Sequence, residues 1–156
     1  MIELDIRYLE ESQISEIIEL IKRIFDEFEA PEYSEEGIQE FYSYITPEGF
    51  KERLEKNHFT LVAMVKDRLA GVIEIRDNNH ICLLFVDKQY HKKSIAKRLL
   101  EEAISIAKSN QTVEFSIDVN SSPYAVEIYK KMGFLPTDNE QLVNGIRFIP
   151  MSRRIE

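Results

Sequence analysis

Residues 83–100 read Leu-Leu-Phe-Val-Asp-Lys-Gln-Tyr-His-Lys-Lys-Ser-Ile-Ala-Lys-Arg-Leu-Leu. The run starts with apolar residues of strand type and passes through a polar segment rich in lysine. Apolar residues then recur at helical spacing, at Ile95, Ala96, Leu99, Leu100 and Ala103. A strand that leads through a basic loop into a helix directs free backbone N–H groups and the positive end of the helix dipole at one point. The stretch therefore predicts a binding site for an anionic phosphate.

The composition indicates one folded domain. The chain has 156 residues, of which 44% are hydrophobic, and this is enough to build a core. The net charge of −8 disfavours nucleic acid as a partner. We see no leader-like pattern at the start and no apolar run that would span a bilayer. We therefore expect a cytoplasmic protein without a membrane partner.

The charges are distributed unevenly along the chain. Acidic residues dominate residues 1–56, whereas residues 88–98 contain no acid. The bases of that second segment are Lys88, Lys92, Lys93, Lys97 and Arg98. A basic loop in an acidic protein favours an anionic ligand at the loop, and the acidic N-terminal third tolerates cations. The competing explanation is that both segments are simply solvated surfaces.

Cysteine and histidine give no sign of a metal site. Cys82 is the single cysteine, which excludes an internal disulfide framework and a cysteine-rich zinc site. Its place in an apolar run predicts a buried and inert thiol. His58, His80 and His91 lack the spacing of metal ligands, so we expect no metal.

The periodicity predicts an α/β domain with a mixed, mostly antiparallel central sheet and helices on both faces. Ser12, Ser34 and Thr46 stand where they can begin helices. Helices are expected over 14–28, 35–45, 47–54, 94–108 and 123–132. Strands are expected over 3–9, 59–66, 69–76, 80–86, 112–119 and 146–153. Residues 135–145 are rich in turn formers and receive no element.

The loop His91-Lys92-Lys93-Ser94-Ile95-Ala96 lies between the expected central strand and the following helix. It resembles the pyrophosphate-binding signature of the GNAT N-acetyltransferase superfamily, Gln/Arg-x-x-Gly-x-Gly/Ala. Two positions depart from that pattern, because His91 replaces Gln or Arg and Ser94 replaces the first glycine. If the loop requires a positive φ at Ser94, the substitution costs energy and weakens binding. We expect near-helical geometry instead, in which serine still donates its backbone N–H.

A second segment, Asn120-Ser-Ser-Pro-Tyr-Ala-Val-Glu-Ile-Tyr-Lys-Lys-Met-Gly-Phe134, resembles the late segment of the same superfamily. The residues that match in type and order are Asn120, Ala125, Ile128, Tyr129, Met132, Gly133 and Phe134. The distance between the two motifs fits one helix plus one strand. Together the motifs cover about the C-terminal half of the chain.

The resemblance implies a single N-acetyltransferase domain over 1–156 that uses acetyl-CoA as co-substrate. Residues 1–56 would supply a strand and the acceptor-side helices, 57–119 the central sheet and CoA loop, and 120–156 the last helix and strands. It implies that backbone groups of Leu84, Phe85 and Val86 hold the pantetheine arm and the acetyl carbonyl. The remaining residues that it assigns to CoA are His91, Lys92, Lys93, Ser94, Ile95, Ala96, Lys97 and Asn120.

The resemblance also suggests catalytic residues. Tyr129 stands at the family's tyrosine position and would protonate the departing thiolate, with packing in the core as the alternative. Glu74 lies in an otherwise apolar strand beside the cofactor strand, and we expect it to be the general base. A pair with Arg76 or with a base on a neighbouring strand is the alternative for Glu74. Asp118 is a weaker candidate base.

The acceptor is expected at the first two helices, which are variable in the superfamily. They carry aromatic residues among many glutamates: Phe25, Phe28, Tyr33, Phe41, Tyr42 and Tyr44. Aromatic walls with carboxylates favour a small-molecule primary amine of positive charge. Two other functions stay open, a non-catalytic acetyl-CoA-binding sensor or interaction module and a domain that has lost CoA binding. The oligomeric state is also open, with a homodimer among the options.

Overall fold

The computed structural model describes residues 3–91 and 94–156, so Lys92 and Lys93 of the expected CoA loop lie outside the described residues. Its helices are α1 (Ile14–Phe28), α2 (Glu35–Tyr44), α3 (Pro47–Leu54), α4 (Ile95–Ser109) and α5 (Val126–Lys131). Its strands are β1 (Asp5–Tyr8), β2 (His58–Val65), β3 (Arg68–Arg76), β4 (His80–Val86), β5 (Phe115–Ser121), β6 (Leu135–Pro136), β7 (Gln141–Val143) and β8 (Ile146–Ile155). Short 3-10 turns cover Glu11–Gln13, Ala30–Glu32 and Lys88–Tyr90.

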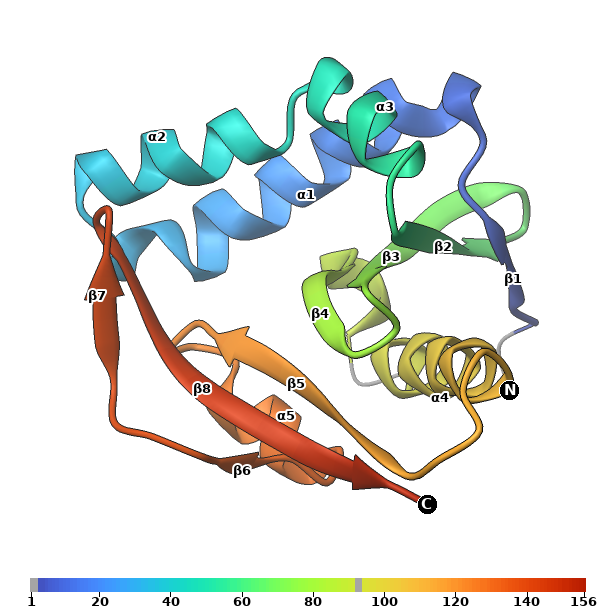
Figure 1. Ribbon diagram of the computed structural model, residues 1–156. Helices are drawn as coiled ribbons and strands as arrows, with labels where there is room; N and C mark the ends of the chain where they lie inside the picture. The colour runs from blue at the N-terminus through green and yellow to red at the C-terminus, as the bar shows by residue number, and fades with distance from the viewer. Residues whose placement is uncertain (1–2, 92–93) are drawn as a thin grey trace.

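The strands form a mixed sheet in the order β1-β2-β3-β4-β5-β8-β6, with β7 paired to β8 (Figure 1). Every neighbouring pair is antiparallel except β4 and β5, which α4 connects as a crossover. The predicted fold class is therefore confirmed. Residues 135–145, for which no helix or strand was predicted, contain the short strands β6 and β7, which pair with β8.

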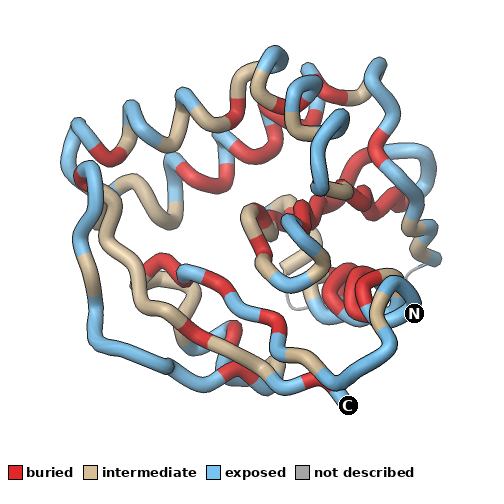
Figure 2. Tube along the Cα trace, in the orientation of Figure 1, coloured by how far each residue is buried: buried red, intermediate tan, exposed pale blue. Residues whose placement is uncertain are grey.

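Helices cover both faces of the sheet and divide the core in two (Figure 2). The α1-side cluster buries seven residues of α1, including Ile17, Ile21 and Phe25, against the sheet. The α4-side cluster joins Leu99 and Leu100 of α4 to strands β2–β5. Because the exposed positions of both helices are polar, each apolar stripe fixes which face its helix presents to the sheet.

The N-terminal ends of the helices correct one prediction from the sequence and confirm two others. Ser12 does not cap α1, because a 3-10 turn precedes the helix and Glu10 and Gln13 form a reciprocal capping box there. Ser34 caps α2 through a 3.2 Å bond from the Gly37 amide, and Thr46 caps α3 in the same way.

The first turn of α2 docks on the turn between β7 and β8 (Figure 1). The Ser34 hydroxyl bonds to the Gly145 carbonyl at 3.4 Å. A Cβ atom at Gly37 would lie 2.1 Å from that same carbonyl oxygen, so only glycine permits this approach. The contact holds the acceptor-side helix over the sheet. Among the described residues, no helix combines the length and apolar character required to cross a membrane.

Candidate active site

A break in the sheet between β4 and β5 creates the site. The parallel pairing of these strands is confined to His80 with Asp118 and Ile81 with Val119. The β3–β4 register shifts at the same level, because Glu74 pairs with Leu83 whereas Ile75 pairs with Ile81. Cys82 is therefore the extra residue of a β-bulge, and bulges bend strands and end pairing.

The bulge leaves backbone groups of β4 available beyond Cys82. Leu84, Phe85 and Val86 stay paired with β3 on one side, whereas the described pairing with β5 has ended. Backbone N–H and C=O groups in a strand point alternately to its two sides, so some of them face the opening. An open strand edge of this kind can pair with an extended chain, such as the acyl-pantetheine arm expected from the sequence.

A cavity of about 300 Å³ lies at this opening. Its walls come from both sides of the sheet, with Glu29, Tyr33 and Phe41 on the α1 side and Tyr129 on the α5 side. Leu84, Phe85 and Asn120 also line it, as predicted residues of the CoA site. Val86 does not line the cavity, and its carbonyl oxygen accepts a 2.8 Å hydrogen bond from His91 Nε2.

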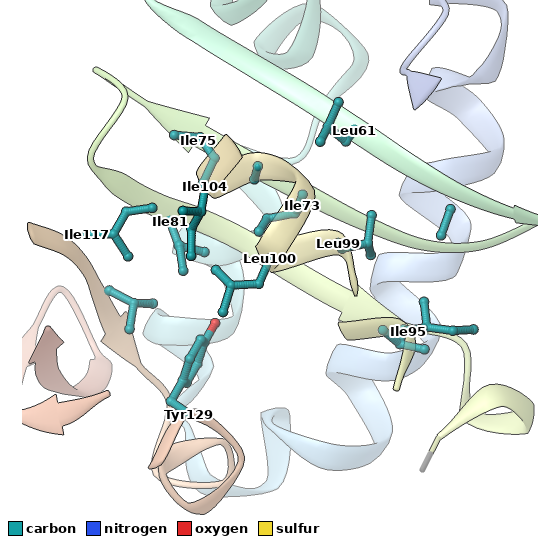
Figure 3. Close-up of a cluster of buried hydrophobic side chains, with 14 of the residues drawn as sticks. Leu61, Ile73, Ile75, Ile81, Ile95, Leu99, Leu100, Ile104, Ile117 and Tyr129 are labelled. Carbon is teal, nitrogen blue, oxygen red and sulfur yellow. The ribbon is translucent and has the colours of Figure 1, made fainter. Parts of the chain in front are cut away.

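Tyr129 borders both the cavity and the core. Its ring is 6% exposed and packs edge-on against Phe134, with ring centroids 5.4 Å apart. Figure 3 shows the hydroxyl oxygen directed toward Leu100 at the rim of the α4-side cluster. Burial, with a smaller contribution from the charge of Glu29, raises the pKa of Tyr129 well above its usual value. The phenol is therefore a proton donor and not a phenolate at neutral pH.

Glu74 is held in a buried polar cluster. Its side chain is 1% exposed, Arg53 donates to it at 2.7 Å, and the Tyr44 hydroxyl donates at 2.8 Å. The Arg53 guanidinium also stacks 3.7 Å from the Tyr44 ring centroid. The ion-pair alternative from the sequence is thus realised, although with Arg53 of α3 instead of Arg76. Tyr44 lines the cavity and Glu74 does not, so the carboxylate is linked to the site through the phenol that bonds it.

The geometry at Ser94 corrects the expectation of a near-helical residue. Ser94 has φ 64° and ψ 17°, which is the left-handed region, and its side chain makes no cap hydrogen bond. The turn from the loop into α4 thus requires the conformation that glycine supplies without strain. Serine at this position carries the penalty that the family's glycine avoids.

The other predicted CoA residues differ in what they can offer. The Ile95 side chain is buried in the core, Ala96 is half-buried, and Lys97 is exposed at the start of α4. For Ile95, only the backbone N–H at the helix N-terminus is available to a phosphate. The free backbone N–H groups at the N-terminus of α4 therefore suit an anion such as a pyrophosphate.

Three of the six predicted aromatic residues reach the cavity. Tyr33, Phe41 and Tyr44 line it. Phe25 is buried in the core and stacks on Phe41, with ring centroids 4.0 Å apart, and therefore only supports that wall. Phe28 stacks on Tyr124 outside the lining, and Tyr42 is turned away to bond Asp26.

Donor atoms of His58, Glu74 and Cys82 lie within 4.8 Å of one another, a grouping across three strands that their sequence spacing did not reveal. Arg53 already places its positive charge on Glu74, which disfavours a cation at the same oxygen. Cys82 is half-buried, and burial raises the pKa of its thiol to about 11, in line with the predicted inert thiol. Asp118 is exposed and bonded to His80.

Glu29 is a cavity residue that the sequence analysis did not single out. It ends α1 as the C-cap residue and is half-buried. Burial raises the pKa of Glu29 to about 7, the Ser122 hydroxyl hydrogen bond lowers it, and the nearby Glu32 raises it again. An acid at a helix C-terminus opposes the helix dipole, which is a local signal that could have identified it.

A family model described as an acetyltransferase (GNAT) domain matches residues 29–155 of the chain. The chain belongs to the GNAT acetyltransferase family, and it is an N-acetyltransferase. This GNAT protein is similar in structure to a GCN5-related N-acetyltransferase from Rhodopseudomonas palustris, with TM-score 0.82, 17% identity, and coverage of 99% of this chain and 98% of the other.

A second similar structure is PaiA N-acetyltransferase from Thermoplasma acidophilum in complex with coenzyme A, with TM-score 0.78, 26% identity, and coverage of 98% and 99%. A third is an aminoglycoside 6′-N-acetyltransferase complexed with coenzyme A, with TM-score 0.71, 15% identity, and coverage of 97% of each chain. The full-length coverage places the break between β4 and β5 within a fold that these proteins share with the GNAT protein.

Proposed function

We propose that this GNAT protein transfers the acetyl group of acetyl-CoA to the primary amine of a small cationic molecule. The observation that carries the proposal is that one cavity is lined from one side of the sheet by Glu29, Tyr33, Phe41 and Tyr44, and from the other side by Tyr129. An amine that enters from the α1 side meets carboxylates and aromatic faces, which attract an ammonium group.

The acetyl-CoA site is supported by the strand edge and the helix end. The extended arm would pair with backbone groups of Leu84 to Val86, whose β5 side is open. The pyrophosphate would rest on the loop from His91 to Lys97 and on the N-terminus of α4. The thioester supplies an activated acetyl carbonyl when it is bound there. PaiA N-acetyltransferase, which has a similar fold, was solved in complex with coenzyme A, and this supports a CoA ligand for the GNAT protein.

Tyr129 is proposed as the general acid. Its hydroxyl makes no side-chain hydrogen bond within 3–91 and 94–156, so it is available to a ligand in the cavity that it lines. Its raised pKa keeps the phenol protonated at neutral pH, so a proton is present at the cavity when the thiolate develops. Positioned proton transfer of this kind contributes about 10²–10⁴-fold to the rate.

Glu74 remains a proposed base, although its contacts in the structure oppose that role. Its two carboxylate oxygens already accept hydrogen bonds, one from Arg53 and one from the Tyr44 hydroxyl. Tyr44 stands between Glu74 and the cavity, so a proton would have to pass through that phenol. The same contacts support a positioning role, in which Glu74 fixes Tyr44 in the acceptor wall.

An amine panel assayed with acetyl-CoA tests the proposed function. Release of the CoA thiol is expected with small cationic primary amines and not with anionic or neutral acceptors. Binding of acetyl-CoA without thiol release for any amine would replace the proposal with the non-catalytic sensor or interaction module.

A further inference from the structure

We propose that Glu29 is the group that accepts the proton of the acceptor's ammonium. The inference rests on the proposed function, because it assigns a base for that same transfer. It differs from the sequence-based choice of Glu74.

The position of Glu29 fits the task. It lines the cavity from the end of α1, on the side where the acceptor-side helices lie, whereas Tyr129 lines it from α5. A base and an acid on opposite walls are what direct attack of an amine on a thioester requires. The amine nitrogen would approach from one side while the sulfur departs toward the other.

No cation neutralises the Glu29 carboxylate among the described residues, since its side chain takes part in no ion pair there. Arg147, whose charge acts on the neighbouring Glu32 and Tyr33, is committed to Glu140 and to the Glu32 carbonyl. Arg76, which also lines the cavity, pairs with Asp77. Glu29 therefore contrasts with Glu74, whose charge Arg53 already pairs. A positively charged ligand is the missing partner for Glu29.

The groups around Glu29 control its proton affinity. Glu32 and Tyr33 face it from the turn after α1, Ser122 and Tyr124 from the loop before α5, and Tyr129 from α5. Burial and Glu32 raise the pKa of Glu29, while Ser122 lowers it, which leaves it at about 7. A carboxylate of that pKa is half ionised at neutral pH and takes up a proton readily. The Ser122 hydroxyl oxygen accepts a hydrogen bond from the Ala125 amide at 3.2 Å, and this leaves the hydroxyl proton free to be donated.

With Glu29 as base and Tyr129 as acid, every proton of the transfer is accounted for. The bound ammonium loses one proton to Glu29, and the freed nitrogen forms the new bond to the acetyl carbon. The C–S bond breaks, and the thiolate receives the Tyr129 proton. The nitrogen loses its second proton to the Tyr129 phenolate, and Glu29 passes the first to solvent. The sum is an amide, a free CoA thiol and one released proton.

The dependence of kcat/KM on pH tests the inference, with a cationic amine that the wild-type protein accepts. The wild-type rate should rise with pH through a limb near pH 7, because the base must be ionised. Glu29→Gln should lose that limb and about 10²–10⁴-fold in rate, and Glu29→Asp should keep the limb. Glu32→Gln should move the limb to lower pH, and Ser122→Ala should move it to higher pH, since they remove effects of opposite sign.

Melting temperature and acetyl-CoA affinity, measured for each variant, confirm that the fold and cofactor site are intact. With a cationic acceptor whose reacting amine is itself unprotonated at the assay pH, the rate deficit of Glu29→Gln should narrow, which a merely structural role would not produce. A Glu29→Gln variant that keeps the limb, or loss of the limb in Glu74→Gln instead, would overturn the inference. A wild-type protein that releases no thiol with any amine would instead overturn the proposed function.

Discussion

Gly37 at the start of α2 and Gly145 in the β7–β8 turn approach so closely that a Cβ atom at Gly37 would lie 2.1 Å from the Gly145 carbonyl oxygen. Gly145 itself has φ 81°, and a Cβ there would lie 2.4 Å from the Gly37 amide nitrogen. The two glycines thus connect the last hairpin of the chain to the helix that carries Phe41 and Tyr44. The shape of the acceptor wall depends on residues a hundred positions apart.

Gly37→Ala should displace α2 from the hairpin. Backbone atoms on both sides cannot move as a flexible side chain would, so we expect a loss of about 1–3 kcal/mol in the free energy of unfolding. The KM for the acceptor should rise while acetyl-CoA affinity stays unchanged. Urea unfolding measures the first effect, with Gln39→Ala on the exposed face of α2 as the control. A Gly37→Ala protein as stable as that control would show that the contact is not rigid.

Ser94→Gly should stabilise the protein. Its left-handed backbone costs an L-residue about 1 kcal/mol that glycine does not pay. Part of this gain is offset, because glycine has more freedom in the unfolded chain. We expect a higher melting temperature and a lower Kd for acetyl-CoA.

Ser109→Gly at the other end of α4 provides the matched control for Ser94→Gly. Ser109 is the last residue of α4 and does not have a positive φ, so glycine there relieves no strain and should destabilise by up to about 1 kcal/mol. The same substitution should thus change the stability in opposite directions at the two ends of one helix. Equal destabilisation at both ends would contradict the backbone conformation at Ser94.

Tyr129→Phe should lower kcat by about 10²–10⁴-fold without weakening acetyl-CoA binding. The ring keeps its packing against Phe134, so the melting temperature should barely change. Tyr42→Phe is the control, because that phenol bonds Asp26 outside the cavity. Stopped assays of thiol release under saturating acetyl-CoA give kcat for both variants. An unchanged kcat for Tyr129→Phe would remove its role as acid.

Glu74→Gln should destabilise the fold strongly, because it leaves the Arg53 charge buried without a carboxylate. Arg53 is 11% exposed and Glu74 1% exposed, and removing one partner of such a pair costs about 3–5 kcal/mol. Glu127→Gln, at an exposed pair with Lys130, should change stability by less than about 1 kcal/mol. A similar small effect at both positions would mean that the buried cluster does not depend on its charge.

Alkylation of Cys82 should be slow at neutral pH. Its thiol pKa of about 11 lies above the usual value because the thiol is buried, and only the thiolate reacts. The rate with iodoacetamide should therefore keep rising tenfold per pH unit past pH 9, where an ordinary thiol levels off. The same protein in denaturant provides the control, with a plateau near the ordinary pKa of about 8.5. A folded-state plateau below pH 9 would contradict the buried environment.

The fold could be predicted from periodicity because its signals are local. The strand over 80–86 has the bounds that the spacing predicted, and the helix Ile14–Phe28 contains the apolar positions that predicted it. β6 and β7 escaped prediction since each is two or three residues long and gains its strand geometry from β8. The start of α1 was misjudged because a 3-10 turn that Glu10 caps precedes the helix and includes Ser12.

The site was harder to predict than the fold because it depends on breaks in regular structure. Cys82 and Leu83 are sequence neighbours, yet both pack toward the α1 side, because the bulge interrupts the alternation of β4. The partners of Glu74 lie on α3 and α2, far from it in sequence. Glu29 belongs to no motif, and its significance appears only when α1 and α5 are seen to share one cavity.

Release of CoA thiol from acetyl-CoA across a panel of small amines tests the central claim most directly. The account predicts that thiol release matches acetylated product one for one with cationic primary amines, and that Tyr129→Phe abolishes most of it. Exclusive use of anionic or neutral acceptors, or acetyl-CoA binding with no thiol release for any amine, would contradict the account.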